Sequence, residues 1–136
     1  MILVDAGPMV ALIHADDHHH ERCKEVLRSL REPMATVWPP VTEAMYLLGF
    51  SPEAQQALWE LIERSWILVL PLDLDDVPRI RELMVKYKDL PMDFADAALV
   101  RVCEREKIQR IFTLDRRDFS VYRPADLGTF DIVPAD

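Results

Sequence analysis

Short apolar runs alternate with longer segments of helical periodicity along the chain. Most residues of the short runs are β-branched or aromatic, and continuous apolar runs of this length are typical of strands covered on both faces. The candidate strands are ILV, MATVW, WILVL, RIFTL and FDIV, at residues 2–4, 34–38, 66–70, 110–114 and 130–133. The pattern therefore predicts about five short, buried strands.

The segments between these runs place apolar side chains on one helical face, three and four positions apart. Ser51 and Pro52 are typical of a helix start, with a cap residue followed by proline. Strands separated by helical crossovers predict an α/β fold with a mainly parallel central sheet and helices on both faces. The predicted helical segments lie within residues 23–30, 54–62, 77–87 and 94–108.

The composition fits one compact domain spanning residues 1–136. A chain of 136 residues is long enough to bury its own core, and half of its residues are hydrophobic. Cys23 and Cys103 form no CxxC motif, which favours two reduced, buried thiols. No targeting segment is visible, and the run WILVLPL is far shorter than the roughly 20 residues that cross a bilayer. We expect a cytoplasmic protein without a membrane partner.

The net charge of −8 disfavours a nucleic-acid partner at first sight, because proteins that bind phosphates are usually basic. The charge could also belong to a solubilising surface. A third interpretation is that some carboxylates form a metal site, where bound cations would offset them. The positions of the acidic residues distinguish these interpretations.

Four acidic residues stand in largely apolar surroundings. Asp5 and Asp115 directly follow predicted strands, and ligands of open α/β sheets bind at the carboxyl ends of strands. Glu43 lies in VTEAMYLLGF, which is apolar nearly all round, so we expect its helix to be buried. Asp96 lies at the edge of the apolar face of the last long helix, one turn after Asp93. Spacing alone does not decide whether Asp96 reaches the same crevice.

Convergence of these carboxylates would demand a cation. Two like charges about 4 Å apart repel by about 4 kcal/mol at an effective dielectric constant near 20. Hard oxygen ligands favour Mg²⁺ or Mn²⁺, which can activate water and stabilise charge on a phosphoryl oxygen. Each carboxylate alone could instead be a helix cap, as Asp5 could be before GPMVALI. All four together, with Glu43 in an apolar helix, favour the metal site.

The segments MILVDAGPMVAL, VTEAMYLL, MDFADAALV and IFTLDRRDF have the order and spacing of a PIN domain. The sequence resembles the VapC-type toxin ribonucleases of bacterial toxin–antitoxin pairs from Ile2 to about Val133. This resemblance implies a metal-dependent endoribonuclease, a hydrolase of RNA phosphodiester bonds. It also implies Mg²⁺ or Mn²⁺ held by the family's acidic positions, which fall on Asp5, Glu43, Asp96 and Asp115.

The resemblance carries further expectations. Thr113 occupies the hydroxyl position of the last motif, and Asp93 and Asp118 are additional carboxylates, so these three are candidates for the outer shell of the metal. Many relatives have Thr or Ser where this chain has Ala6, which removes one polar contact but no acidic ligand. The implied partners are an RNA substrate, a second copy in a homodimer, and a cognate antitoxin protein. The antitoxin peptide would block the substrate groove and could place an arginine in the acidic pocket.

Other residues are open to two interpretations. Arg116 and Arg117 could hold flanking phosphates or be solvated loop charges. The histidines at 18–20 point in different directions on a helix and make a poor joint ligand set. Three tryptophans could stack on bases, but their apolar surroundings favour packing in the core or an interface. They are Trp38, Trp59 and Trp66.

Other functional classes fit less well. A signalling receiver domain needs an acidic pair after the first strand and a late lysine, and a haloacid-dehalogenase phosphatase needs Asp-x-Asp where this chain has DAG. A catalytically silent PIN module that binds RNA or acts as a scaffold stays open, although the intact acidic positions weigh against it. A housekeeping nuclease also stays open beside the toxin. Metal dependence of RNA cleavage separates the enzyme from the silent module.

Overall fold

A computed structural model describes residues 1–135 of the chain, and every predicted strand is present in it. The strands are β1 (Ile2–Val4), β2 (Met34–Thr36), β3 (Ile67–Val69), β4 (Arg110–Phe112) and β5 (Asp131–Val133). They form one sheet in the order β3-β2-β1-β4-β5, and every neighbouring pair is parallel. The predicted α/β class with a five-stranded parallel sheet is confirmed.

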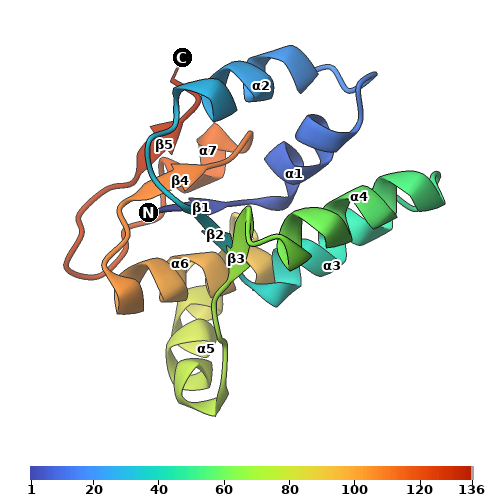
Figure 1. Ribbon diagram of the computed structural model, residues 1–136. Coiled ribbons are helices and arrows are strands. Elements are labelled where there is room, and N and C mark those ends of the chain that lie inside the picture. The colour runs from blue at the N-terminus through green and yellow to red at the C-terminus, as the bar shows by residue number, and fades with distance from the viewer. Residues whose placement is uncertain (136) are drawn as a thin grey trace.

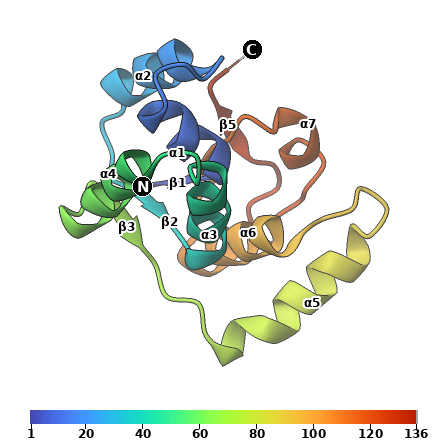
Figure 2. The same cartoon turned by 90° about the vertical axis from the view of Figure 1, so that its right-hand side faces the viewer.

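Helices cover both faces of this sheet (Figures 1 and 2). In Figure 1, α1 and α2 lie above the sheet, while α5 and α6 lie below it. Helix α3 contacts both α1 and α6, so it lies at one end of the sheet between the two layers. The helices are α1 (Ala6–Ile13), α2 (His20–Ser29), α3 (Trp38–Leu47), α4 (Pro52–Glu63), α5 (Val77–Lys86), α6 (Phe94–Glu106) and α7 (Arg116–Phe119), with a 3₁₀ turn η1 at Leu74–Asp76.

The central strand β1 divides the core into two parts. Leu3 packs in a cluster with side chains of α5 and α6, whereas Ile2 and Val4 pack in a second cluster with those of α1 to α4. Successive side chains of a strand point to opposite faces, so an all-apolar strand needs a covering layer on each side. The unbroken apolar character of ILV therefore follows from its central position.

The strand order reverses at β1, and this reversal creates the crevice of the fold. The chain adds β2 and β3 on one side of β1 and then returns to add β4 and β5 on the other. Val4 and Phe112, the last residues of β1 and β4, are paired in the parallel register. Connections that diverge from adjacent strand ends leave an opening at this edge, which is where open α/β sheets bind ligands.

The expectation that the helix of Glu43 is buried all round is wrong. Within α3, Pro40, Val41 and Ala44 are buried and Met45 packs partly buried against the core, whereas Tyr46 is 83% exposed and Leu47 is 47% exposed. Helix α3 lies at the end of the sheet, where its neighbours cover one face. The sequence of a helix that is apolar on all sides does not show which of its faces packs against the core and which is exposed.

The three tryptophans also lie outside the core. Trp38, Trp59 and Trp66 are 49%, 40% and 63% exposed, so the described part of the chain does not bury them fully. Both cysteines are free and buried, as expected. Within residues 1–135, no helix has the length and apolar character needed to span a bilayer.

Candidate active site

A cavity of about 430 Å³ opens at the carboxyl ends of β1 and β4. Its walls come from four parts of the chain: the end of β1, helix α3, the start of α6, and the segment after β4. The structure therefore brings together every acidic residue singled out in the sequence. These are Asp5, Glu43, Asp93, Asp96, Asp115 and Asp118.

Asp5 lies at the base of the cavity and is only 8% exposed. Its Oδ1 accepts a hydrogen bond from the Ala6 N–H at 2.8 Å, so it also caps α1. Its Oδ2 accepts a hydrogen bond from the Thr113 hydroxyl at 2.8 Å. Burial raises the pKa of Asp5; these hydrogen bonds lower it in part, and the charges of Asp115 and Asp93 raise it further. Asp5 is thus both the N-cap of α1 and a member of the acidic site.

Thr113 links the first and last acidic motifs. It is buried, and while its hydroxyl donates to Asp5, the same oxygen accepts the Asp115 N–H at 3.0 Å. The side chain therefore fixes the distance between the ends of β1 and β4. Thr113 thus lies beside two of the ligand candidates, and its outer-shell role stays a prediction.

Asp96 reaches the cavity from the first turn of α6. The Tyr122 hydroxyl donates to its Oδ2 at 2.7 Å, and the Asp93 carboxylate accepts its backbone N–H at 2.8 Å. Burial raises the pKa of Asp96 to about 8; the Tyr122 hydrogen bond opposes this rise, and the charges of Asp5, Asp93 and Asp115 add to it. Asp93 caps α6 and lines the cavity as well.

The turn after β4 brings two more carboxylates beside Asp96. Asp115 caps the short helix α7 by accepting the Asp118 N–H at 3.2 Å. One carboxylate oxygen from each of Asp96, Asp115 and Asp118 lies within 4.8 Å of the others. Burial, followed by the charge of Asp115 and a hydrogen bond with it, raises the pKa of Asp118. Asp118, expected in the outer shell, belongs to this group together with Asp96 and Asp115.

Glu43 closes the cavity from α3. The residue is exposed overall, but partial withdrawal of its carboxyl from water raises its pKa, and the charges of Asp5 and Asp93 raise it further. Burial is the largest cause of each of these raised pKa values, and repulsion among the unneutralised carboxylates adds to it. A divalent cation removes that repulsion, and a set of oxygen donors alone suits Mg²⁺ or Mn²⁺. The residues present therefore fit such an ion.

The two arginines after Asp115 differ in their surroundings. Arg116 is half-buried, and its guanidinium donates to the backbone carbonyls of Ile132 and Pro134 at 3.2 and 2.8 Å. It fastens β5 and the residue after it to α7. Arg117 is exposed on the same short helix.

Tyr122 is the residue of this site that the sequence did not reveal. It lies beyond the last acidic motif, in SVYRPADLG, where no periodicity or spacing singles it out. Its contact with Asp96 depends on how the chain folds back from α7 onto α6. Only the three-dimensional structure supplies that information.

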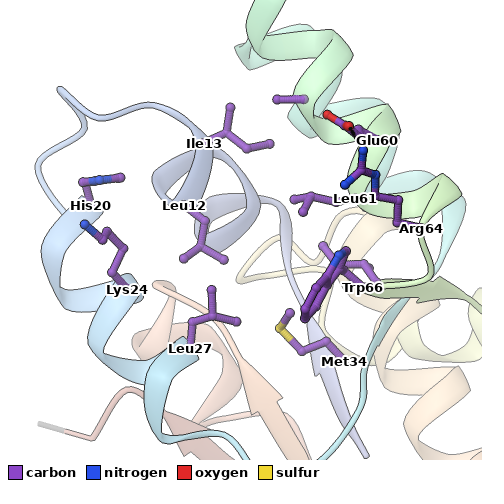
Figure 3. A pocket seen from close by; sticks show the side chains of 12 residues that line it. Leu12, Ile13, His20, Lys24, Leu27, Met34, Glu60, Leu61, Arg64 and Trp66 are labelled. Carbon is purple, nitrogen blue, oxygen red and sulfur yellow. Dashed lines mark ion pairs between the residues drawn. The ribbon is translucent and has the colours of Figure 1, made fainter.

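A second cavity, of about 760 Å³, lies between α1, α2, α4 and β3, and none of its lining residues borders the acidic cavity (Figure 3). Leu12, Leu27 and Trp66 point into it, and Met34 forms its floor (Figure 3). Its rim carries charges, including an ion pair between Arg64 and Glu60 at 2.7 Å. It is a mainly apolar groove, which we call the α1–α2–α4 groove.

Comparisons with known proteins show which sequences and folds this chain resembles. The chain is 29% identical over 136 residues to ribonuclease VapC26 of Mycobacterium tuberculosis (strain ATCC 25618 / H37Rv), covering 98% of this chain and all of the relative. Its fold is similar to that of M. tuberculosis VapC20, described as a sarcin–ricin loop cleaving toxin, with a TM-score of 0.78, 22% identity, and coverage of 85% of this chain and 91% of that one.

A toxin–antitoxin complex from Klebsiella pneumoniae contains a similar chain, with a TM-score of 0.69 at 17% identity, covering 89% of this chain and 92% of that one. The sequence also matches the family described as PIN domain over residues 2–123. This match spans all the acidic residues of the cavity, and the resemblance inferred from the sequence motifs is confirmed. The chain belongs to the PIN domain family.

Proposed function

We propose that this protein is a metal-dependent endoribonuclease and the toxin of a toxin–antitoxin pair. The observation that carries the proposal is the convergence of six carboxylates from four parts of the chain in one cavity of a PIN domain. The relative named ribonuclease VapC26, which aligns along its full length, supports hydrolysis of RNA. The silent module is disfavoured because no acidic position is missing.

The ion would be Mg²⁺ or Mn²⁺. Asp96, Asp115 and Asp118 supply the three mutually close oxygens, and Asp5 and Glu43 line the same cavity. When bound, such a cation supplies an activated water and stabilises negative charge on a phosphoryl oxygen. The protein holds the carboxylates in place through Thr113, the Asp93 cap and the turn of α7.

The charge of the cavity makes cation binding a condition for RNA binding. Without a cation, the carboxylates repel the phosphates of the substrate. Arg117 lies exposed beside Asp118 and is placed to contact a flanking phosphate. Arg116 is a weaker candidate for that role, since its guanidinium donates to two backbone carbonyls.

The antitoxin is the proposed protein partner. The similarity to a chain in a toxin–antitoxin complex supports such a partner, and an antitoxin arginine is suited to the acidic cavity. The α1–α2–α4 groove is suited to an apolar segment of the same partner, because it is large, mainly apolar and rimmed by charges. Both sites together would hold one antitoxin chain.

We also propose that the protein acts in the cytoplasm as a homodimer. Helix α3 exposes Trp38, Tyr46 and Leu47, and Phe50 beyond its end is 61% exposed. Exposed apolar patches of this kind mark interaction surfaces. Light scattering after gel filtration should give twice the mass of one chain, and Tyr46→Arg should reduce it to one.

The test is cleavage of a mixed RNA pool by the wild type beside Asp96→Asn, with Mg²⁺ or Mn²⁺ and with chelator. The wild type should cleave only with metal, and Asp96→Asn should lose cleavage while it keeps the circular dichroism of the wild type. Asp75→Asn is the matched control, because Asp75 is exposed on η1 and outside the cavity, and it should cleave normally. Cleavage that survives chelator, or full activity of Asp96→Asn, would overturn the assignment.

A further inference from the structure

We infer that Tyr122 is a positioning residue that holds the Asp96 carboxylate in the orientation needed for cation binding. This inference rests on the proposed metal site. It adds a residue outside the acidic set, contributed by the segment after α7. The residue acts through Asp96 and touches neither the ion nor the substrate.

The hydrogen bond between the two residues is short, and its donor comes from a buried side chain. The Tyr122 hydroxyl donates to Asp96 Oδ2 at 2.7 Å, and the Tyr122 side chain is fully buried. A bond to one oxygen fixes the rotation of the whole carboxyl group, so the direction of the other oxygen is fixed too. An Asp without such a partner would turn away from the neighbouring carboxylates.

The tyrosine ring is itself held rigidly. Tyr87 and Phe119 pack edge-on against it, with ring centroids 5.1 and 5.0 Å away. Aromatic contacts of this geometry restrict both the position and the tilt of a ring. The hydroxyl of Tyr122 is therefore a fixed donor.

The same residue also contacts the other wall of the site. The Tyr122 backbone N–H donates to the Asp118 carbonyl at 3.2 Å. Tyr122 is thus bonded to Asp96 on α6 and to Asp118 on α7, two of the three residues whose carboxylate oxygens lie within 4.8 Å of one another. Tyr122 therefore links α6 and α7, which are separate segments of the chain that meet at the site.

The alternative explanation is that Tyr122 only fills space in the core. In that case, loss of its hydroxyl would not affect cation binding. Tyr87 provides the matched control for it. Tyr87 is buried in the same aromatic cluster, and its hydroxyl accepts the Arg123 N–H at 2.9 Å without touching a carboxylate. Replacement of either tyrosine by phenylalanine removes one hydroxyl and leaves the ring.

The experiment measures Mn²⁺ affinity of the wild type, Tyr122→Phe and Tyr87→Phe by the electron paramagnetic resonance of free Mn²⁺. The activating Mn²⁺ concentration for RNA cleavage is measured alongside. Loss of a partner that orients a metal ligand typically weakens metal binding by about 10- to 100-fold. We expect at least a tenfold weaker affinity for Tyr122→Phe, with cleavage largely restored at saturating Mn²⁺. Tyr87→Phe should bind as the wild type does.

The outcomes separate this inference from the proposed function. If the wild type binds no Mn²⁺, the proposed metal site fails and the role of Tyr122 fails with it. If the wild type binds Mn²⁺ and Tyr122→Phe binds equally well, only the positioning role is overturned. Equal weakening in Tyr122→Phe and Tyr87→Phe would also overturn it, because general packing would then explain the effect.

Discussion

The Thr113 hydroxyl bridges two motifs that are 108 positions apart, donating to Asp5 Oδ2 at 2.8 Å while it accepts the Asp115 N–H at 3.0 Å. Threonine at this position therefore supplies a hydrogen bond to the buried Asp5 carboxylate and holds the turn that carries Asp115. A hydroxyl is required for both bonds, since a methyl group of the same size provides neither.

Thr113→Val should lower the free energy of unfolding by about 1–3 kcal/mol, the usual cost of a buried polar group without its partner. It should also weaken Mn²⁺ binding, because Asp5 and Asp115 lose their link. Thr113→Ser should retain both properties. Urea unfolding in chelator and Mn²⁺ titration are the measurements.

Thr36→Val is the control for that experiment. Thr36 is buried on β2, and its hydroxyl donates to the Val4 carbonyl at 2.8 Å and not to a carboxylate. Its loss should reduce stability without changing Mn²⁺ affinity. Equal metal binding by Thr113→Val and the wild type would show that the bridge is structural only.

The acidic cavity should make the metal-free protein less stable as pH rises. The folded state keeps a proton on Asp96 up to a pKa of about 8, whereas the unfolded chain releases it near 3.8. The folded state therefore binds more protons between these values, and stability falls with rising pH across that window. The raised pKa values of Asp5, Glu43 and Asp118 act in the same direction.

Thermal unfolding in chelator from about pH 5 to about pH 9 measures this effect, and Asp96→Asn should flatten the curve. Asp76 and Glu104, whose pKa values are lowered, lose their contribution only as pH falls through and below about 4, so they do not mask it. Added Mg²⁺ should reverse the trend, because the cation competes with the protons. A melting temperature in chelator that rises from about pH 5 to about pH 8 would contradict the prediction.

The sequence predicted the parts of the site that depend on strand ends. Asp5 and Asp115 directly follow apolar runs, and parallel strands place their carboxyl ends at one edge, so their proximity needs no further information. Asp96 required the family resemblance, because its position depends on how α6 crosses the sheet. Ser51 was found as a cap because the signal is local, and its side chain accepts the Ala54 N–H at 3.2 Å.

Other features had no signal in the sequence. Helix α7 spans only Arg116–Phe119, which is too short to display a helical period. The exposure of Tyr46 depends on which neighbours α3 meets, and the contact of Tyr122 depends on the return of the chain from α7. Such features follow from packing between distant segments.

Asp76 should be important for stability but not for cleavage. It is 1% exposed, and it accepts hydrogen bonds from Arg101 and Arg105, each at 2.8 Å. Burial alone would raise the pKa of Asp76, but the backbone N–H of Asp73 and the two guanidiniums lower it below its usual range. The charged form is therefore the one that the folded protein stabilises.

Asp76→Ala should cost about 3–5 kcal/mol of stability, because two partly buried guanidiniums lose their shared anion. The exposed neighbour Asp75→Ala should change stability by less than about 0.5 kcal/mol. Urea unfolding measures both variants. The ion pairs are unimportant if the two variants unfold at the same urea concentration.

Asp118 and Asp93 should differ in their effect on cation binding, although both were expected in the outer shell. Asp118 contributes an oxygen to the close group with Asp96 and Asp115, whereas Asp93 caps α6 and is not a member of that group. Asp118→Asn should therefore weaken Mn²⁺ binding as strongly as Asp115→Asn does. Asp93→Asn should weaken it less, since asparagine also caps helices well and Asp93 is not one of the three residues whose carboxylate oxygens lie close together.

Calorimetric titration of the metal-free variants with Mn²⁺ at one pH distinguishes these roles. Asp118→Asn and Asp115→Asn should each lose about tenfold or more in affinity, a loss of at least about 1.4 kcal/mol in binding free energy. Asp93→Asn should retain most of the affinity and lose helix stability only slightly, because the cap hydrogen bond to the Asp96 N–H can be kept. An Asp118→Asn variant with the affinity of the wild type would return Asp118 to the outer shell and leave Asp96 and Asp115 with Asp5 or Glu43 as the remaining oxygen donors.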